Sequence, residues 1–205
     1  MTDRLPDGFT FHPQFLTRKM QQDLLEAVTE AVRGDAPFYQ PLMPRTGRKM
    51  SVVMSNFGPL GWVADVDGYK YTTTHPVTSK PWPSMPQILY ELWDRLTDYP
   101  APPEACLINW YREGAKMGLH VDSDEQDLRA PIVSISLGDP ARYRLGGPKR
   151  GGKTHALKLS SGDVIVLKDE ARRCYHGVDK LWYGQSTLIP KGGRINLTMR
   201  RVNRP

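Results

Sequence analysis

The sequence predicts a mainly β domain, built as a sandwich or barrel, with helices flanking it. From residue 105 onward the chain divides into short runs of strand-forming residues, separated by turns that contain Gly, Pro or Asp. Helical periodicity is confined to two segments of the N-terminal half. The 205 residues fit one domain, which we divide into residues 1–104, with the helices and a lid, and the β core of residues 105–205.

Two amphipathic helices are expected before the β core. The first covers residues 17–32, where apolar side chains recur at helical spacing, and Gly34 ends it. The second begins at Ser84, with Pro86 in its first turn and Gln87 in position for a capping box. Between them, residues 45–80 hold Gly, Pro and aromatic clusters that favour short strands and an ordered loop, so we expect a substrate lid there.

The β core is expected to contain seven strands, each marked by its β-branched, aromatic or alternating residues. They are Cys106–Tyr111, Ile132–Leu137, Arg142–Leu145, Ala156–Leu159, Val164–Leu167, Cys174–Val178 and Arg194–Val202.

Composition excludes several classes of protein. A hydrophobic content of 39% with 24% charged residues is enough to bury a core and excludes a disordered chain. The apolar runs fall far short of the roughly 20 residues that cross a bilayer, and residues 1–8 lack the apolar stretch of a signal peptide. We therefore expect a cytoplasmic monomer in which Cys106 and Cys174 are buried thiols and form no disulfide.

The charge balance is basic, with a net charge of +6 and a pI of about 9.3. Basic residues are clustered in a way that could neutralise the phosphates of a nucleic acid. A solvated basic surface explains the same pattern equally well. The clusters are Arg45, Arg48 and Lys49; Lys149, Arg150 and Lys153; Arg172 and Arg173; and Arg200, Arg201 and Arg204.

Three residues could hold a metal ion. His120 and Asp122 are two positions apart, so in an extended segment both side chains point to the same face. His176, on another predicted strand, would complete a set of two histidines and one carboxylate, which leaves coordination positions open as in non-haem Fe(II) oxygenases. The alternatives are a solvent-exposed His120 near a loop and a His176 that is satisfied by a backbone carbonyl.

The last strand has two different faces. Ile195, Leu197 and Met199 lie on one face, and Arg194, Asn196, Thr198 and Arg200 lie on the other. An exposed edge strand would show the same alternation. If the polar face instead points into a barrel, its two guanidinium groups and one amide make a receptor for a dicarboxylate, because a guanidinium grips a carboxylate through two hydrogen bonds.

These motifs, taken in order, resemble the bacterial AlkB family of Fe(II)/2-oxoglutarate-dependent dioxygenases. The resemblance covers residues 62–202, and it departs from the best-known bacterial members at Val121 and Leu167, which affects the expected substrate range. The motifs are Asn109–Tyr111, Gly114–Lys116, His120–Asp122, Arg129–Ser134, Gly162–Val164, Tyr175–Val178 and Arg194–Arg200.

The resemblance implies a double-stranded β-helix core (a jelly roll, as in cupins) and an N-terminal nucleotide-recognition lid. It implies Fe(II) held by His120, Asp122 and His176, with 2-oxoglutarate and O2 as cosubstrates. It further implies that the cosubstrate is bound by Asn109, Tyr111, Arg194, Asn196 and Arg200. In the lid, Trp62 would stack on an extruded base and Tyr69 would contact the nucleic-acid backbone. Outside the lid, Asp124 and Arg150 would contact the substrate.

The implied activity is oxidative demethylation of alkylated bases, such as N1-methyladenine and N3-methylcytosine. The substrates would be DNA, including single strands, and RNA, and the products formaldehyde, succinate and CO2. Such a methyl group makes the base cationic and blocks pairing, so the base is easier to extrude and suits a pocket with an aromatic face and a carboxylate. Two alternatives are a dioxygenase of the same scaffold acting on a protein, lipid or small molecule, and a nucleic-acid binding module without turnover.

Overall fold

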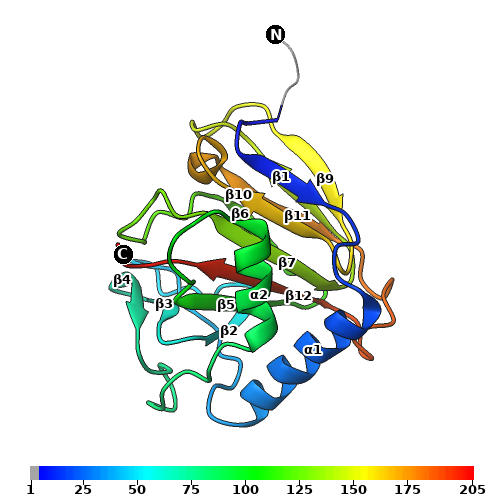
Figure 1. Cartoon of the computed structure of the whole chain (residues 1–205). Coiled ribbons are helices and arrows are strands. Elements are labelled where there is room, and N and C mark those ends of the chain that lie inside the picture. Colours follow the sequence, from blue (N-terminus) through cyan, green and yellow to red (C-terminus); the bar gives the residue numbers. More distant parts are fainter. Residues whose placement is uncertain (1–4) are drawn as a thin grey trace.

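The computed structural model describes residues 5–205, which form two facing antiparallel sheets and a separate hairpin (Figure 1). The six-stranded sheet has the order β1 (Phe9–His12), β10 (Val164–Leu167), β7 (Ile132–Gly138), β12 (Arg194–Arg200), β5 (Ala105–Tyr111) and β2 (Val53–Phe57). The four-stranded sheet has the order β6 (Met117–His120), β11 (His176–Leu181), β8 (Ala141–Leu145) and β9 (His155–Leu159). The hairpin pairs β3 (Gly61–Asp65) with β4 (Gly68–Thr72).

Neighbouring strands of the six-stranded sheet are distant in the sequence, as in a jelly roll. β12 lies between β5 and β7, and β10 lies between β7 and β1, all in antiparallel pairs. Both edge strands, β1 and β2, come from the N-terminal half of the chain. The mainly β core with flanking helices is confirmed, and residues before 105 complete its larger sheet.

The six-stranded sheet buries both of its faces. One face packs against the four-stranded sheet, where Leu107 and Ile165 meet Tyr143 and Leu159 in a single apolar cluster. The other face carries the helices α1 (Arg18–Arg33) and α2 (Gln87–Leu96), visible in front of the sheet in Figure 1. β10, which is covered on both sides, is apolar throughout, whereas β12 alternates because its polar face lines the cavity between the sheets.

The first helix agrees with the sequence prediction, but the second begins later than predicted. Thr17 caps α1 by accepting a hydrogen bond from the Met20 amide at 3.2 Å, and Gly34 ends the helix. The predicted start of the second helix at Ser84 and its capping box are wrong, because α2 begins at Gln87 and no side chain caps it. Pro86 explains the difference, since a proline disfavours helical backbone in the residue before it.

All seven predicted strands of the β core are present, and β10 has the predicted limits. The strand predicted at Cys174–Val178 instead begins at His176, as β11. The Cys174 amide donates its hydrogen bond to the Ala171 carbonyl of the 3₁₀ turn Ala171–Arg173, so Cys174 is not part of the strand. The last strand ends at Arg200 and does not continue to Val202. The strands β1 and β6, each of four residues, were not predicted.

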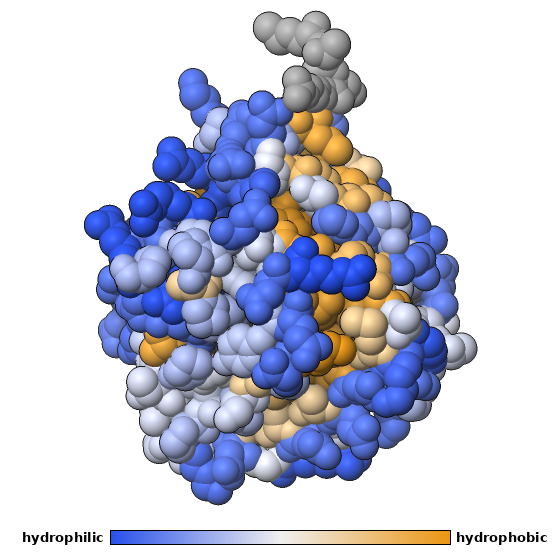
Figure 2. All heavy atoms as spheres, viewed as in Figure 1, coloured by the Kyte–Doolittle hydropathy of each residue, from blue (hydrophilic) through white to orange (hydrophobic). Residues whose placement is uncertain are grey.

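Residues 45–80, the predicted lid, contribute β2 to the core sheet and form the hairpin of β3 and β4. Figure 2, viewed from the same side as Figure 1, shows hydrophobic side chains gathered in a band beside α2 and polar side chains around them. Within residues 5–205, no helix is both long and apolar enough to cross a membrane. Cys106 and Cys174 are buried free thiols, as predicted. Residues 1–4, on which the expected lack of a signal peptide partly depends, lie outside the described residues.

Candidate active site

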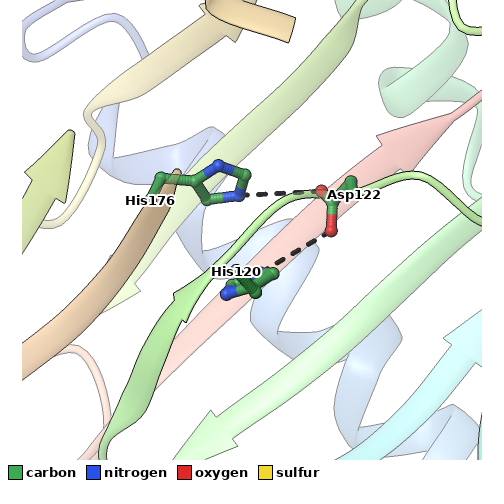
Figure 3. A group of neighbouring side chains, drawn as sticks. All are labelled: His120, Asp122 and His176. Atoms are coloured by element: carbon green, nitrogen blue, oxygen red, sulfur yellow. Dashed lines mark ion pairs between the residues drawn. The ribbon is translucent and has the colours of Figure 1, made fainter. Parts of the chain in front are cut away.

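His120, Asp122 and His176 come together between the two sheets (Figure 3). His120 is the last residue of β6, His176 is the first residue of β11, and the two are directly paired across the strands. Asp122 lies in the loop after β6, with its two carboxylate oxygens 3.6 Å from His120 Nε2 and 3.7 Å from His176 Nε2. One ligand atom from each side chain lies within 4.8 Å of the others, a spacing that fits one metal ion.

Backbone contacts orient both imidazole rings for metal binding. Nδ1 of His120 lies 2.9 Å from the Gly118 carbonyl, and Nδ1 of His176 lies 3.0 Å from the Cys174 carbonyl. A carbonyl only accepts hydrogen bonds, so each Nδ1 carries the proton and each Nε2 lone pair faces Asp122. The hydrogen bond to a backbone carbonyl, which we considered as an alternative to metal binding by His176, is therefore present. The same bond also prepares His176 as a ligand.

The protonation states also suit a metal site. Burial, reinforced by the nearby His120, lowers the pKa of His176 to about 4, so its imidazole is neutral at pH 7. Burial alone would raise the pKa of Asp122, but Arg200 and both histidines hold that pKa well below its usual value. Two imidazoles and one carboxylate form the donor set of a non-haem Fe(II) site, so the residues present fit this ion.

A cavity of about 590 Å³ opens beside these three residues. Its apolar wall includes Ile165 and Leu167, and several polar side chains from the facing sheets point into it. Four of the polar residues that line the cavity have buried atoms without a hydrogen-bond partner among the described residues: Asn109, Tyr143, Arg194 and Arg200. Because buried polar atoms are rarely left unpaired, the polar wall that they form is shaped for an anionic or strongly polar ligand.

Arg194 is the clearest ligand-binding group in this wall. It is 1% exposed, and only its Nη2 has a partner, the Ser136 hydroxyl at 2.8 Å. Nε and Nη1 have no partner among the described residues, so the guanidinium keeps charged donors with which it can bind a carboxylate. Burial lowers the pKa of Arg194 to about 10, so the group is still cationic at pH 7. The residues fit one carboxylate of 2-oxoglutarate.

The other residues predicted to bind the cosubstrate differ in how much bonding capacity they keep. Asn109 and Tyr111 line the cavity, and burial raises the pKa of Tyr111 to about 12, so its hydroxyl stays protonated. Both amide hydrogens of Asn196 are used by β7, on the Ser134 hydroxyl at 2.7 Å and the Ile135 carbonyl at 2.9 Å. Asn196 therefore holds β12 and β7 in register at the cavity wall.

The four residues predicted to contact the substrate all line the mouth of the cavity. Trp62 is only partly buried and donates a hydrogen bond from Nε1 to Asp124 Oδ2 at 2.7 Å. Tyr69, 46% exposed, stacks on one face of Trp62 with ring centroids 5.2 Å apart. Arg150 reaches across from the β8–β9 loop toward the Leu119 carbonyl at 3.4 Å. A lid side chain and the loop of the metal ligands thus meet directly.

Sequence reasoning missed a buried polar network behind the site. Glu125 accepts hydrogen bonds from Tyr71 of the hairpin and from Arg172 at 2.7 Å, and its carboxylate lies 3.4 Å from Arg200. Arg200 in turn donates to Asp122 at 3.0 Å. The network links the lid to the metal-ligand loop. The nearest sequence signal was the carboxylate three residues after Asp122, which no short motif identifies.

Comparisons with known proteins agree with this geometry. A family model described as the 2OG-Fe(II) oxygenase superfamily matches residues 8–200. The chain is 49% identical over 195 residues to the alpha-ketoglutarate-dependent dioxygenase AlkB homolog of Caulobacter vibrioides, a match that covers 95% of this chain and 88% of that protein. The chain belongs to the AlkB family of 2OG-Fe(II) oxygenases. It is also 46% identical to the Escherichia coli dioxygenase AlkB, over 84% of this chain and 81% of that protein.

More distant AlkB relatives extend the comparison. A solved structure described as "The structure of OsALKBH1" matches with a TM-score of 0.81 at 28% identity, over 97% of this chain and 99% of that one. Partial matches are a DNA N(6)-methyladenine demethylase of Arabidopsis thaliana, 41% identical over 40% of this chain, and a tRNA demethylase of Schizosaccharomyces pombe, 34% identical over 60%. They cover 24% and 42% of those proteins. The match to the 2OG-Fe(II) oxygenase superfamily begins at residue 8, so it includes β1 and α1 as well as the core.

Proposed function

We propose that this dioxygenase removes methyl groups from alkylated bases of DNA, including single strands, and of RNA. Lesions of the N1-methyladenine and N3-methylcytosine type are the proposed substrates, and the activity is direct-reversal repair. When bound, Fe(II) and 2-oxoglutarate would activate O2 and oxidise the methyl group, giving succinate, CO2, formaldehyde and the unmodified base.

One observation carries this proposal: the same cavity presents the three metal ligands, a receptor for a carboxylate, and an aromatic lid. His120, Asp122 and His176 would hold Fe(II), and Arg194 would bind the distal carboxylate of 2-oxoglutarate. The volume of about 590 Å³ is in the range of sites that enclose a small ligand. The apolar side chains around the metal ligands would exclude bulk water from the reaction.

The mouth of the cavity is suited to a cationic base. Trp62 offers an aromatic face, and Asp124 offers a carboxylate at hydrogen-bonding distance from the same indole. A methylated base that carries positive charge is attracted by both groups, whereas an unmodified base gains less from the carboxylate. Tyr69 and Arg150, exposed at the rim, would contact the nucleic-acid backbone. The names of the demethylase relatives, which act on DNA or tRNA, support this substrate class.

Two alternatives lead to different products. A dioxygenase for a protein, lipid or small molecule would release succinate with that substrate and not with a methylated oligonucleotide. A binding module without turnover would release no succinate at all. The exposed basic clusters of residues 45–49 and 149–153 and the exposed Tyr69 of the lid favour the nucleic acid, whereas Arg172 and Arg200 are buried and take no part in such a surface.

The test is succinate and formaldehyde production by the Fe(II)-loaded protein on a panel of single- and double-stranded DNA and RNA oligonucleotides, each with one methylated base. We expect formaldehyde in equal amount to succinate on methylated oligonucleotides and little of either on unmethylated controls. Succinate without formaldehyde on the whole panel would overturn the proposed function. The monomeric state, the cytoplasmic location and the two-part division at residue 105 stay predictions.

A further inference from the structure

The outer face of the four-stranded sheet carries a row of cations. Lys180 of β11 pairs with Arg142 of β8, and Arg142 pairs with Lys158 of β9, so three basic side chains lie side by side across three strands. Arg144 stands two residues along β8 on the same face. We call Arg142, Arg144, Lys158 and Lys180 the outer basic patch.

Acidic residues do not balance this patch. Asp179 is the only acid within the four described strands of this sheet, and it already bonds Arg142 at 2.7 Å and Arg144 at 2.9 Å. Four cations against one carboxylate leave a local charge of +3. Like charges placed directly opposite each other destabilise a sheet, so this arrangement favours a bound anion over a purely structural role.

The patch is open to solvent and ordered. Lys158 and Lys180 are exposed, and their ammonium groups lie 5.3 Å and 5.2 Å from the centre of the Trp182 ring. Stacking on this ring holds both lysines above the sheet without neutralising them. Because the lysines occupy the indole, the surface suits phosphate groups more than stacked bases. The helices α1 and α2 lie on the other sheet (Figure 1).

The patch is also continuous with the mouth of the cavity. β8 runs from Arg142 through Arg144 directly into the loop of residues 146–154, which carries Lys149, Arg150 and Lys153. Arg150 lines the cavity. From Leu145 back to Arg142, the strand covers about 10 Å at the usual rise per residue. Basic side chains therefore follow one path from the cavity mouth onto the outer face of the sheet.

We infer that the outer basic patch binds the sugar-phosphate backbone of the substrate strand on one side of the extruded base. The inference rests on the proposed function, and it adds a second contact surface outside the cavity. This surface would contribute affinity and salt dependence without reading the sequence. Its contribution depends on how far the strand extends past the modified base.

The experiment compares a methylated trinucleotide with oligonucleotides that are extended by several nucleotides on either the 5′ or the 3′ side. Binding is measured by fluorescence anisotropy across a series of salt concentrations, and turnover by formaldehyde release. One of the two extensions should increase the affinity of the wild-type protein and steepen its salt dependence. The double variant Lys158→Glu/Lys180→Glu should lose that increase, so that it binds the extended strand about tenfold more weakly than the wild type. The slope of log K against log salt concentration should become shallower by about 1.4, or 0.7 for each lost phosphate contact.

Two controls keep the outcomes separate. Lys19→Glu/Lys168→Glu changes the net charge equally at two exposed lysines outside the four-stranded sheet, and should keep the effect of extension. The patch variant should still convert the trinucleotide at the wild-type rate, which shows that it is folded and active.

Equal behaviour of the patch variant and the control variant would overturn the inference. So would charge-dependent binding to phosphatidylserine vesicles with no gain from either extension, because a membrane would then be the partner. If the wild-type protein converts neither the trinucleotide nor the extended strands, the proposed function fails first, and the inference fails with it.

Discussion

Replacing Arg194 by methionine should weaken 2-oxoglutarate binding and leave the protein without ligand at least as stable as the wild type. Arg194 is fully buried, and two of its three guanidinium nitrogens have no partner among the described residues. Burial depresses its pKa, and the opposing effects of Tyr111 and Asp163 are weaker. Methionine has a similar length, so it fills the space without the charge.

The magnitudes follow from these contacts. A charge-assisted hydrogen bond contributes about 1.5 to 3 kcal/mol, so loss of the carboxylate contact should raise the Kd for 2-oxoglutarate about 10- to 150-fold. Replacing a buried ion pair by apolar side chains of similar volume is often neutral or stabilising, by up to about 4 kcal/mol. A buried charge without a partner costs desolvation that no attraction offsets, so its removal should also stabilise the free protein. Affinity and stability of the free protein should therefore change in opposite directions.

The assay is urea unfolding of the protein with Mn(II) in place of Fe(II), with and without 2-oxoglutarate, combined with calorimetric titration. Wild-type protein should gain stability with the cosubstrate, because a ligand that binds only the folded state stabilises it. The Arg194→Met protein should gain much less. Arg112→Met, at an exposed arginine after β5, serves as the control. A destabilised Arg194→Met protein with unchanged affinity for 2-oxoglutarate would refute the reasoning.

Three further changes test other parts of the site. Alanine at any of His120, Asp122 or His176 should abolish turnover and reduce metal affinity, measured by competition with a metal indicator; near wild-type affinity would exclude that residue as a ligand. Trp62→Ala should weaken use of methylated oligonucleotides by about 1 to 3 kcal/mol, with calorimetric 2-oxoglutarate affinity unchanged; equal loss of both would indicate a packing role. Asp127→Asn should lower the free energy of unfolding at pH 7 by about 1 to 3 kcal/mol, a deficit that begins to shrink in urea titrations below about pH 4 and continues to shrink as the pH falls further.

The sign of that pH dependence follows from the contacts of Asp127. Hydrogen bonds from Arg129 and Tyr99 lower its pKa in the folded protein. A carboxyl whose pKa is lowered by folding stabilises the protein above its unfolded pKa, and the contribution is lost as the pH falls toward the folded value. An asparagine cannot titrate, so the wild-type and variant curves should converge in acid. A constant difference down to pH 3 would contradict this assignment.

The periodicity of apolar residues predicted those elements whose residue pattern has only one structural explanation. The alternation in β12 correctly separated Ile195, Leu197 and Met199, which pack under the helices, from the polar face that lines the cavity. The spacing of apolar residues located α1 because the helix presents a single buried stripe. In both cases the burial that the pattern predicts is what stabilises the element.

Other features depend on partners that are distant in the sequence. β1 has only four residues, and it is a strand because β10 offers an open edge at the matching register. Glu125 is buried because Tyr71 and Arg172, from two other segments, satisfy its carboxylate. Neither pairing leaves a local signal, so sequence reasoning could not find them. The end of β6 at His120, which leaves Asp122 in the following loop, likewise had no local signal.

The two arginines of β12 show how such partners decide function. Arg194 and Arg200 lie on the same face of one strand, and the sequence assigns both to a carboxylate receptor. Burial alone would lower the pKa of Arg200, but Asp122, Tyr71 and Glu125 raise it, because two carboxylates already lie beside the guanidinium. Burial lowers the pKa of Arg194, and the opposing effects of Tyr111 and Asp163 do not offset it. Arg200 is therefore committed mainly to holding the Asp122 loop in place, whereas Arg194 keeps its bonding capacity for a ligand. The same residue type on the same strand thus supports the Asp122 loop at one end of the cavity and would bind the proposed cosubstrate at the other.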